Sequence, residues 1–211
     1  LLTATRTFPT DLPLLGNACG ALSVLADEPA NRLAMLKLRG MSAMCAVLHS
    51  FPHEAALQKN GLRTWLKLMS DEVSARLAAE ARRKNMLDPR EEACAPILAA
   101  MRAYTLDSDL QFMASWATWL LASCEDEGQA RRLLGKGGAG EMVVMALRSF
   151  PDKRDLQYVG CGALLALGKP RQAPQDSKNT NDLSCPQLIT AALGPLGCGW
   201  GAGDGGANEA Q

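Results

Sequence analysis

An aromatic corner that recurs at a regular spacing constrains this 211-residue chain more than any other feature. Its four copies are Phe8-Pro9, Phe51-Pro52, Tyr104-Thr105 and Phe150-Pro151. Each is followed six residues later by a Leu that opens an apolar run. The steps are 43, 53 and 46 residues between the corresponding positions Ala18, Gly61, Ala114 and Gly160. Periods of roughly 40–47 residues are typical of stacked helical units, so the sequence predicts a repeat architecture.

Start and stop signals divide each repeat into three helices. In the clearest repeat the predicted helices span 27–38, 41–50 and 57–69. The first ends at a glycine and the second at an aromatic-Pro corner, because proline removes a backbone donor and disfavours helix in the residue before it. The same order recurs at 125–134, 141–149 and 156–167, with Gly135 to Gly140 as the turn between the first two. A longer repeat inserts a charged stretch over 70–90 before the pattern resumes at 93–103.

Composition narrows the fold class and the range of partners. Apolar residues make up 47% of the chain but aromatic residues only 5%, which favours helices packed through small side chains and therefore an all-α fold. The 22 basic and 22 acidic residues balance to a formal charge of +0, so no global field holds the chain on nucleic acid or on an anionic membrane.

Cysteine usage predicts the compartment. The seven cysteines include no Cys-x-x-Cys pair, so we expect reduced, mostly buried thiols and an intracellular location, cytoplasmic by default. No apolar run approaches the roughly 20 residues that span a bilayer, and the first residues do not resemble a signal peptide. Because the chain opens at Leu1 inside a repeat, we expect a fragment or processed product. An upstream repeat or a partner is then expected to cover the exposed end, since terminal repeats need a polar outer face.

The third helix of each repeat resembles the armadillo family. The matching strings are LLGNACGALSVLA, LQKNGLRTWLKLM, LQFMASWATWLLA and LQYVGCGALLALG. The resemblance implies a right-handed α-solenoid of about four three-helix repeats over residues 1–168. A linker over 169–184 and a partial repeat helix with a flexible Gly-rich tail over 185–211, anchored by Trp200 if a partner holds it, complete the predicted organisation.

The resemblance also indicates which side chains face the groove of such a solenoid. In members that carry nuclear-import cargo this helix holds a Trp and Asn array. Of the Trp positions only Trp116 matches, which argues against an import role. Residues four apart share a helix face. The predicted groove residues are Lys59, Arg63 and Lys67 in the second repeat, Phe112, Trp116 and Leu120 in the third, and Tyr158, Gly162 and Ala166 in the fourth.

This basic ladder beside an aromatic strip suits an extended or helical peptide with one acidic and one large apolar residue. The alternative is that the basic residues form a solvated face and the aromatic residues pack between repeats. A second basic patch, Arg76, Arg82, Arg83 and Lys84, is either a contact for phosphate or an acidic partner or another solvated helix face.

Catalytic, cofactor and metal motifs are weak in this sequence. Gly135 to Gly140 spells G-x-G-x-x-G but follows a charged helix where a dinucleotide site needs a strand, so we interpret it as a turn. His49 and His53 straddle a proline corner and cannot share a helical face as a metal pair does. Cys45 lies four residues before His49 on an apolar helix and reads as a structural thiol. We expect no metal, no cofactor and no enzymatic activity.

The function predicted from these patterns is a non-catalytic scaffold or structural subunit that binds a partner protein along its groove. Two alternatives remain open: a nucleic-acid-binding helical repeat, supported by the basic residues, and the substrate-binding module of a larger enzyme such as a ubiquitin ligase.

Overall fold

The computed structural model of the protein describes residues 1–69, 88–124 and 129–168. The chain divides into two units, Leu1–Gln175 and Asp176–Gln211. The predicted linker over 169–184, the tail over 185–211 with Trp200, and the basic patch Arg76, Arg82, Arg83 and Lys84 all lie outside the described residues.

Every regular element in the described ranges is an α-helix, which confirms the all-α prediction. The helices are α1 (Leu2–Thr7), α2 (Leu12–Leu25), α3 (Pro29–Lys37), α4 (Gly40–Ser50), α5 (Ala55–Met69), α7 (Pro89–Ala103), α8 (Ser108–Ser123), α9 (Gln129–Lys136), α10 (Ala139–Ser149) and α11 (Arg154–Gly168). The predicted bounds of the helices that became α3, α4, α5, α10 and α11 agree with these to within two residues. Sequence patterns did not predict the short helix α1.

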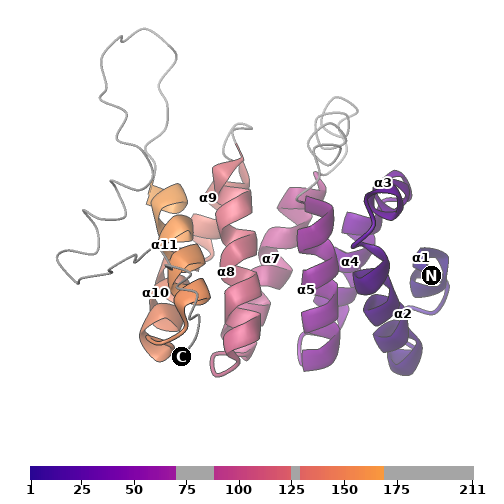
Figure 1. The fold of residues 1–211 in the computed structure, drawn as a ribbon, viewed down its shortest axis with the longest axis horizontal. Helices are drawn as coiled ribbons and strands as arrows, with labels where there is room; N and C mark the ends of the chain where they lie inside the picture. The colour runs from indigo at the N-terminus through magenta and orange to yellow at the C-terminus, as the bar shows by residue number, and fades with distance from the viewer. Residues whose placement is uncertain (70–87, 125–128, 169–211) are drawn as a thin grey trace, which may run out of the picture. The chain divides into compact units, whose positions relative to one another are not determined.

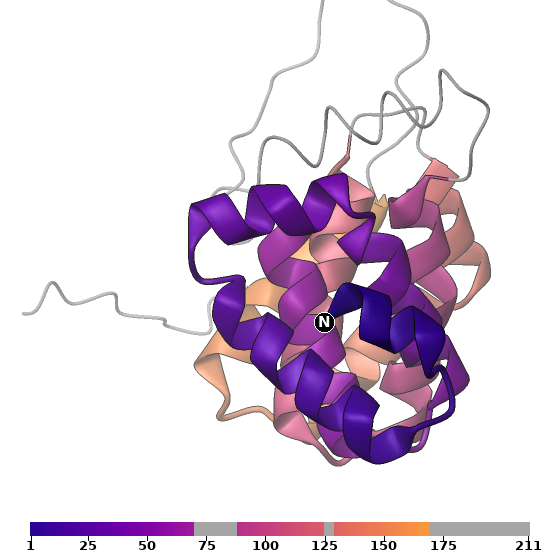
Figure 2. The same ribbon diagram turned by 90° about the vertical axis from the view of Figure 1, so that its right-hand side faces the viewer.

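The helices pack in rows. In Figure 1, α2, α5, α8 and α11 stand side by side, and each contacts the next in that order. A second row runs in the same direction through α1, α4, α7 and α10, and Figure 2 shows the array from its α1 end. The helices α3 and α9 contact members of both rows. The buried cluster of Leu, Met, Ala and Cys side chains lies between these helices.

Aspartates and aromatic corners define the helix ends. The side chain of Asp11 accepts a hydrogen bond from the amide of Leu14 at 3.0 Å, and Asp107 accepts one from Leu110 at 3.1 Å. These bonds satisfy amides that have no partner inside the helix. Phe51, Tyr104 and Phe150 are the C-terminal caps of α4, α7 and α10, and each donates its backbone N–H to the carbonyl four residues earlier. Tyr104 holds this position without a following proline.

A glutamine links each of the last three corners to the helix that follows it. The Nε2 of Gln58 donates to the carbonyls of Leu48 and Phe51 at 2.7 and 2.9 Å. Gln111 makes the same pair of bonds to Met101 and Tyr104, at 2.9 Å each, and Gln157 makes it to Leu147 and Phe150, at 2.8 and 3.0 Å. The repeat seen in the sequence is therefore repeated in the hydrogen bonding. The corresponding residue of the first copy is Leu15, which is fully buried.

The predicted turn from Gly135 to Gly140 is wrong in its length. Helix α9 continues to Lys136 and α10 begins at Ala139, so only Gly137 and Gly138 connect them. A Cβ at Gly135 or Gly140 would meet no atom within 4 Å, and these two glycines sit in ordinary helix. Gly138 has φ of 78°, which glycine adopts without strain, and it caps the start of α10.

None of the helices in the described ranges has the length and hydropathy that a bilayer-spanning segment requires.

Candidate functional site

A groove of about 470 Å³ lies between α5 and α8 and is bounded at one end by the link from α2 to α3. Its lining residues are Ala26, Asp27, Arg32, Arg63, Leu66, Lys67, Asp109, Phe112, Met113 and Trp116. Four of the nine predicted groove residues, Arg63, Lys67, Phe112 and Trp116, therefore line one cavity. The structure places their side chains together although they come from repeats 53 residues apart in the sequence.

Aromatic side chains form the α8 wall of this groove. Phe112 and Trp116 lie one turn apart, with ring centroids separated by 5.8 Å and ring planes inclined by 49°. Both rings are half-buried, so part of each ring packs against the core and the rest remains accessible. Leu66 and Met113 also line the groove and are buried. The arrangement provides an apolar surface with a fixed orientation, which suits a large apolar side chain.

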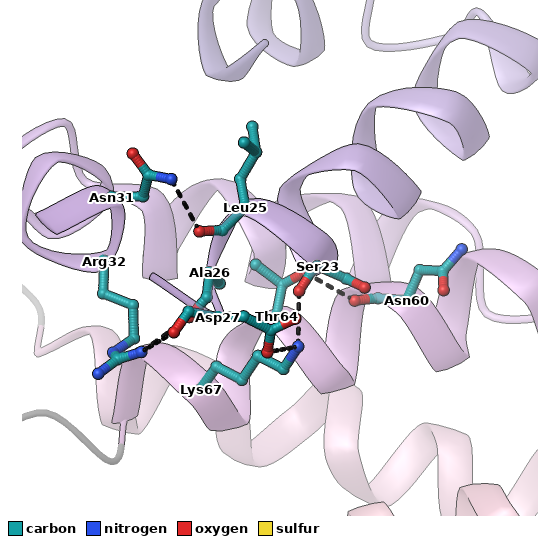
Figure 3. A network of polar contacts seen from close by, with 9 residues as sticks. All are labelled: Ser23, Leu25, Ala26, Asp27, Asn31, Arg32, Asn60, Thr64 and Lys67. Carbon is teal, nitrogen blue, oxygen red and sulfur yellow. Dashed lines mark hydrogen bonds and ion pairs between the residues drawn. The ribbon is translucent and has the colours of Figure 1, made fainter. Parts of the chain in front are cut away.

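Lys67 is held by a polar network at the end of the groove (Figure 3). Its Nζ pairs with the carboxylate of Asp27 and donates to the carbonyl of Ser23 at 2.7 Å. Arg32 donates to the carbonyls of Ala26 and Asp27 at 3.0 and 2.9 Å. The two basic side chains thus satisfy one carbonyl in the last turn of α2, where the helix itself leaves acceptors without partners, and two carbonyls just after it.

Lys59 is also paired within the protein and does not line the groove. Its Nζ lies 2.9 Å from Asp107 and 3.6 Å from Asp109. The hydrogen bond to Asp107 raises the pKa of Lys59, and this outweighs the opposing effect of burial. Burial tends to raise the pKa of Asp107, but hydrogen bonds from Lys59 and from the amides of Leu110 and Asp109 outweigh it and the pKa is lowered. The pair therefore fixes α5 against the start of α8.

Arg63 differs from both lysines of the predicted ladder. Its side chain is exposed, it lines the groove, and within the described ranges it has neither an ion pair nor a side-chain hydrogen bond. The predicted ladder of three basic residues is thus divided into two lysines that are internally paired and one arginine that faces solvent.

The predicted strip does not continue onto α11. Gly162 is buried beneath Trp119, since a Cβ added to Gly162 would lie 2.6 Å from the indole ring, and Ala166 is 2% exposed. The prediction that these two residues face the groove was therefore wrong, because the large side chain of Trp119 fills the space over a glycine. Tyr158 remains 55% exposed and packs edge-on against Trp119 with centroids 5.6 Å apart. Leu120 is half-buried against the core.

A second groove, of about 560 Å³, adjoins the first at the N-terminal ends of α8 and α11. It shares Asp109 and Phe112 with the first groove. Its other lining residues are Ser108, Asp152, Lys153, Arg154, Asp155 and Leu156. Three acidic and two basic residues line it, and three basic and two acidic residues line the first groove. Asp109 belongs to both grooves and pairs with Lys59, so apart from Asp109 the second groove has two carboxylates and two cations.

The buried thiols have the environment of structural residues, and both histidines are exposed. Burial, followed by the charge of Glu92, raises the pKa of the Cys45 thiol far above its ordinary value, and burial raises that of Cys19 to about 11. A thiol kept protonated in this way is a poor nucleophile. His49 lies in the last turn of α4 and His53 follows the corner. No group of three or more His, Cys, Asp or Glu side chains in the described ranges is placed to hold a metal ion.

Several groove residues were not predicted from the sequence. Asp109 was not considered, and Asp27 and Arg32 were treated only as parts of a short first helix. The contribution of Asp27 and Arg32 depends on the placement of the α2–α3 link and α3 beside α5, which lies some thirty to forty residues away in the chain, and no local pattern signals it. The packing of Trp119 was not predicted either. A large side chain in one repeat and a glycine in the next is a sequence signal that could have indicated it.

Comparisons of this chain with protein-family profiles, with curated protein sequences and with solved structures find no match.

Proposed function

We propose that this chain is a non-catalytic scaffold of the right-handed armadillo-like solenoid type, which binds a segment of a partner protein in the groove between α5 and α8. The observation that carries the proposal is the convergence of Arg63, Phe112 and Trp116 on one open cavity. Large apolar rings beside a charged group are characteristic of the anchor positions in protein interfaces. The buried thiols are consistent with a reducing intracellular compartment, where the partner is expected to be found.

The internal ion pairs favour a protein partner over a nucleic acid. A phosphate backbone is bound by several accessible cations in series. Here Lys59 and Lys67 already face carboxylates of the protein, and the adjoining groove has no excess of cations. An apolar anchor is therefore expected to contribute more to affinity than a row of phosphate contacts.

The proposal is tested by affinity capture from native lysate with the full chain and two matched variants. Trp116→Ala removes one of the two aromatic rings in the α8 wall of the groove. Leu106→Ala removes an 88% exposed side chain that does not line it. Both variants are checked for helical content by circular dichroism. A partner that is recovered by the parent and by Leu106→Ala, and lost by Trp116→Ala, supports the groove as the binding site. Equal recovery by all three proteins places the interface elsewhere and refutes the proposal.

A further inference from the structure

One basic side chain that lines the groove, Arg63, has neither an ion pair nor a side-chain hydrogen bond within the described ranges. Asp27 pairs with Lys67, and Asp107 and Asp109 pair with Lys59. Arg32 donates to the carbonyls at the end of α2. In the described ranges no such partner is found for Arg63. The charge available to a ligand is therefore located at one residue rather than spread along a ladder.

We propose that the groove selects peptide segments with a single acidic residue, which pairs with Arg63, next to an aromatic or large aliphatic residue that packs on Phe112 and Trp116. This inference rests on the proposed function and specifies its ligand. The guanidinium group is suited to the task because its planar fork matches a carboxylate in a bidentate geometry.

The adjoining groove limits the ligand to one acidic residue. A segment that extends from the first groove past Phe112 enters a region lined by Asp109, Asp152 and Asp155. Asp109 pairs with Lys59, and the charges of the other two carboxylates are balanced by Lys153 and Arg154, so the region carries no excess positive charge. A second acidic residue therefore finds no excess of cations there, whereas Arg63 is available to the first.

The α8 wall also determines which residue types the ligand can place next to its acidic residue. Phe112 and Trp116 are half-buried and tilted by 49°, so they offer an oriented surface and lose little freedom when a ligand side chain packs on them. Met113 and Leu66 lie buried in the lining. The thioether of a methionine adapts to side chains of different shape, so we expect the groove to accept Phe, Trp, Tyr, Leu or Met at this position.

The experiment is selection of a displayed library of random 12-residue peptides on the immobilised full chain. The parent is compared with Arg63→Glu and with Arg148→Glu, which makes the same charge change on an exposed arginine of α10 away from the groove. The parent and Arg148→Glu are expected to enrich peptides with one acidic position beside an apolar one. Arg63→Glu is expected to replace the acidic position by a basic one. A selected peptide, resynthesised, should bind Arg63→Gln about tenfold more weakly than the parent, the effect of losing one charged hydrogen-bonding partner.

The experiment distinguishes a failure of this inference from a failure of the proposed function. Peptides that are enriched on the parent and lost on Trp116→Ala, but carry no acidic position or carry several, refute the inference and leave the groove as a binding site. An acidic preference that persists in Arg63→Glu also refutes it. If no peptide is enriched, or if the enriched peptides bind Trp116→Ala as well as the parent, both the inference and the proposed function fail.

Discussion

Replacement of Gln111 by Leu isolates the contribution of the glutamine links between corners and helices. The change is close in volume, and Leu15 occupies the corresponding position of the first copy naturally. Gln111 is 2% exposed, and its Nε2 donates to the carbonyls of Met101 and Tyr104 at 2.9 Å each. The substitution therefore removes a donor from two carbonyls at the end of α7.

The expected loss of stability depends on which hydrogen bonds each of the two carbonyls retains. The Tyr104 carbonyl still accepts the amide of Asp107 at 3.1 Å, so it loses one hydrogen bond of two, worth about 0.5–1.5 kcal/mol. The last backbone hydrogen bond of α7 is accepted by the carbonyl of Ala100, so the next carbonyl, that of Met101, depends on Gln111 for a donor. Without Gln111 it is left buried and unsatisfied, which costs about 1–3 kcal/mol. We expect Gln111→Leu to lower the free energy of unfolding by about 2–4 kcal/mol.

Gln157→Leu is the matched control for this prediction. Gln157 makes the same two hydrogen bonds, at 2.8 and 3.0 Å, but it is half-buried. Water can replace the amide there, so we expect a loss of about 1 kcal/mol or less. Urea unfolding of both full-length variants, followed by circular dichroism at 222 nm, measures the difference. Amide exchange should also accelerate in the last turn of α7 in Gln111→Leu alone. Equal losses in the two variants would refute the reasoning from burial.

Two further predictions concern charge and packing. The pKa of Asp107 lies below its ordinary 3.8 and that of Lys59 above its ordinary 10.5. The stabilisation from Asp107 is therefore complete above pH 3.8 and lost as the pH falls through the lowered value, and that from Lys59 is complete below pH 10.5 and lost as the pH rises through the raised value. In Lys59→Met, urea midpoints measured between pH 7 and pH 3 should fall less steeply than in the parent, and an unchanged slope would contradict the ion pair. Gly162→Ala should destabilise the protein because the new methyl group meets the rigid indole of Trp119 at 2.6 Å, with a net loss of up to about 2 kcal/mol after the gain in helix propensity. Gly16→Ala, where a Cβ meets nothing within 4 Å, should instead raise the thermal midpoint of unfolding. If both variants change the stability in the same direction, helix propensity and not packing determines the effect.

Local patterns were sufficient to predict most of the helices and their ends, although α1 was not predicted and α7 begins four residues before the predicted 93–103. The aromatic corners and the apolar periodicity act over a few residues, and their physical effects are local: a missing donor or a buried helix face. For this reason the predicted bounds of α3, α4, α5, α10 and α11 agree with the structure to within two residues. The error at Gly135 to Gly140 has the same origin, since glycine permits a turn but does not require one, and only Gly138 adopts the left-handed conformation there.

The sequence by itself thus determined the all-α class, the period of the repeat and the helix face that carries Arg63, Phe112 and Trp116. The tertiary structure alone decided which of those residues are available to a ligand. Whether a lysine faces solvent depends on the carboxylates that other helices bring to it, and Asp27 and Asp107 reach Lys67 and Lys59 from separate elements. The same holds for packing, since Trp119 covers Gly162 only when α8 and α11 come together. Such pairings join residues tens of positions apart, and the spacing of residues within one helix does not indicate them.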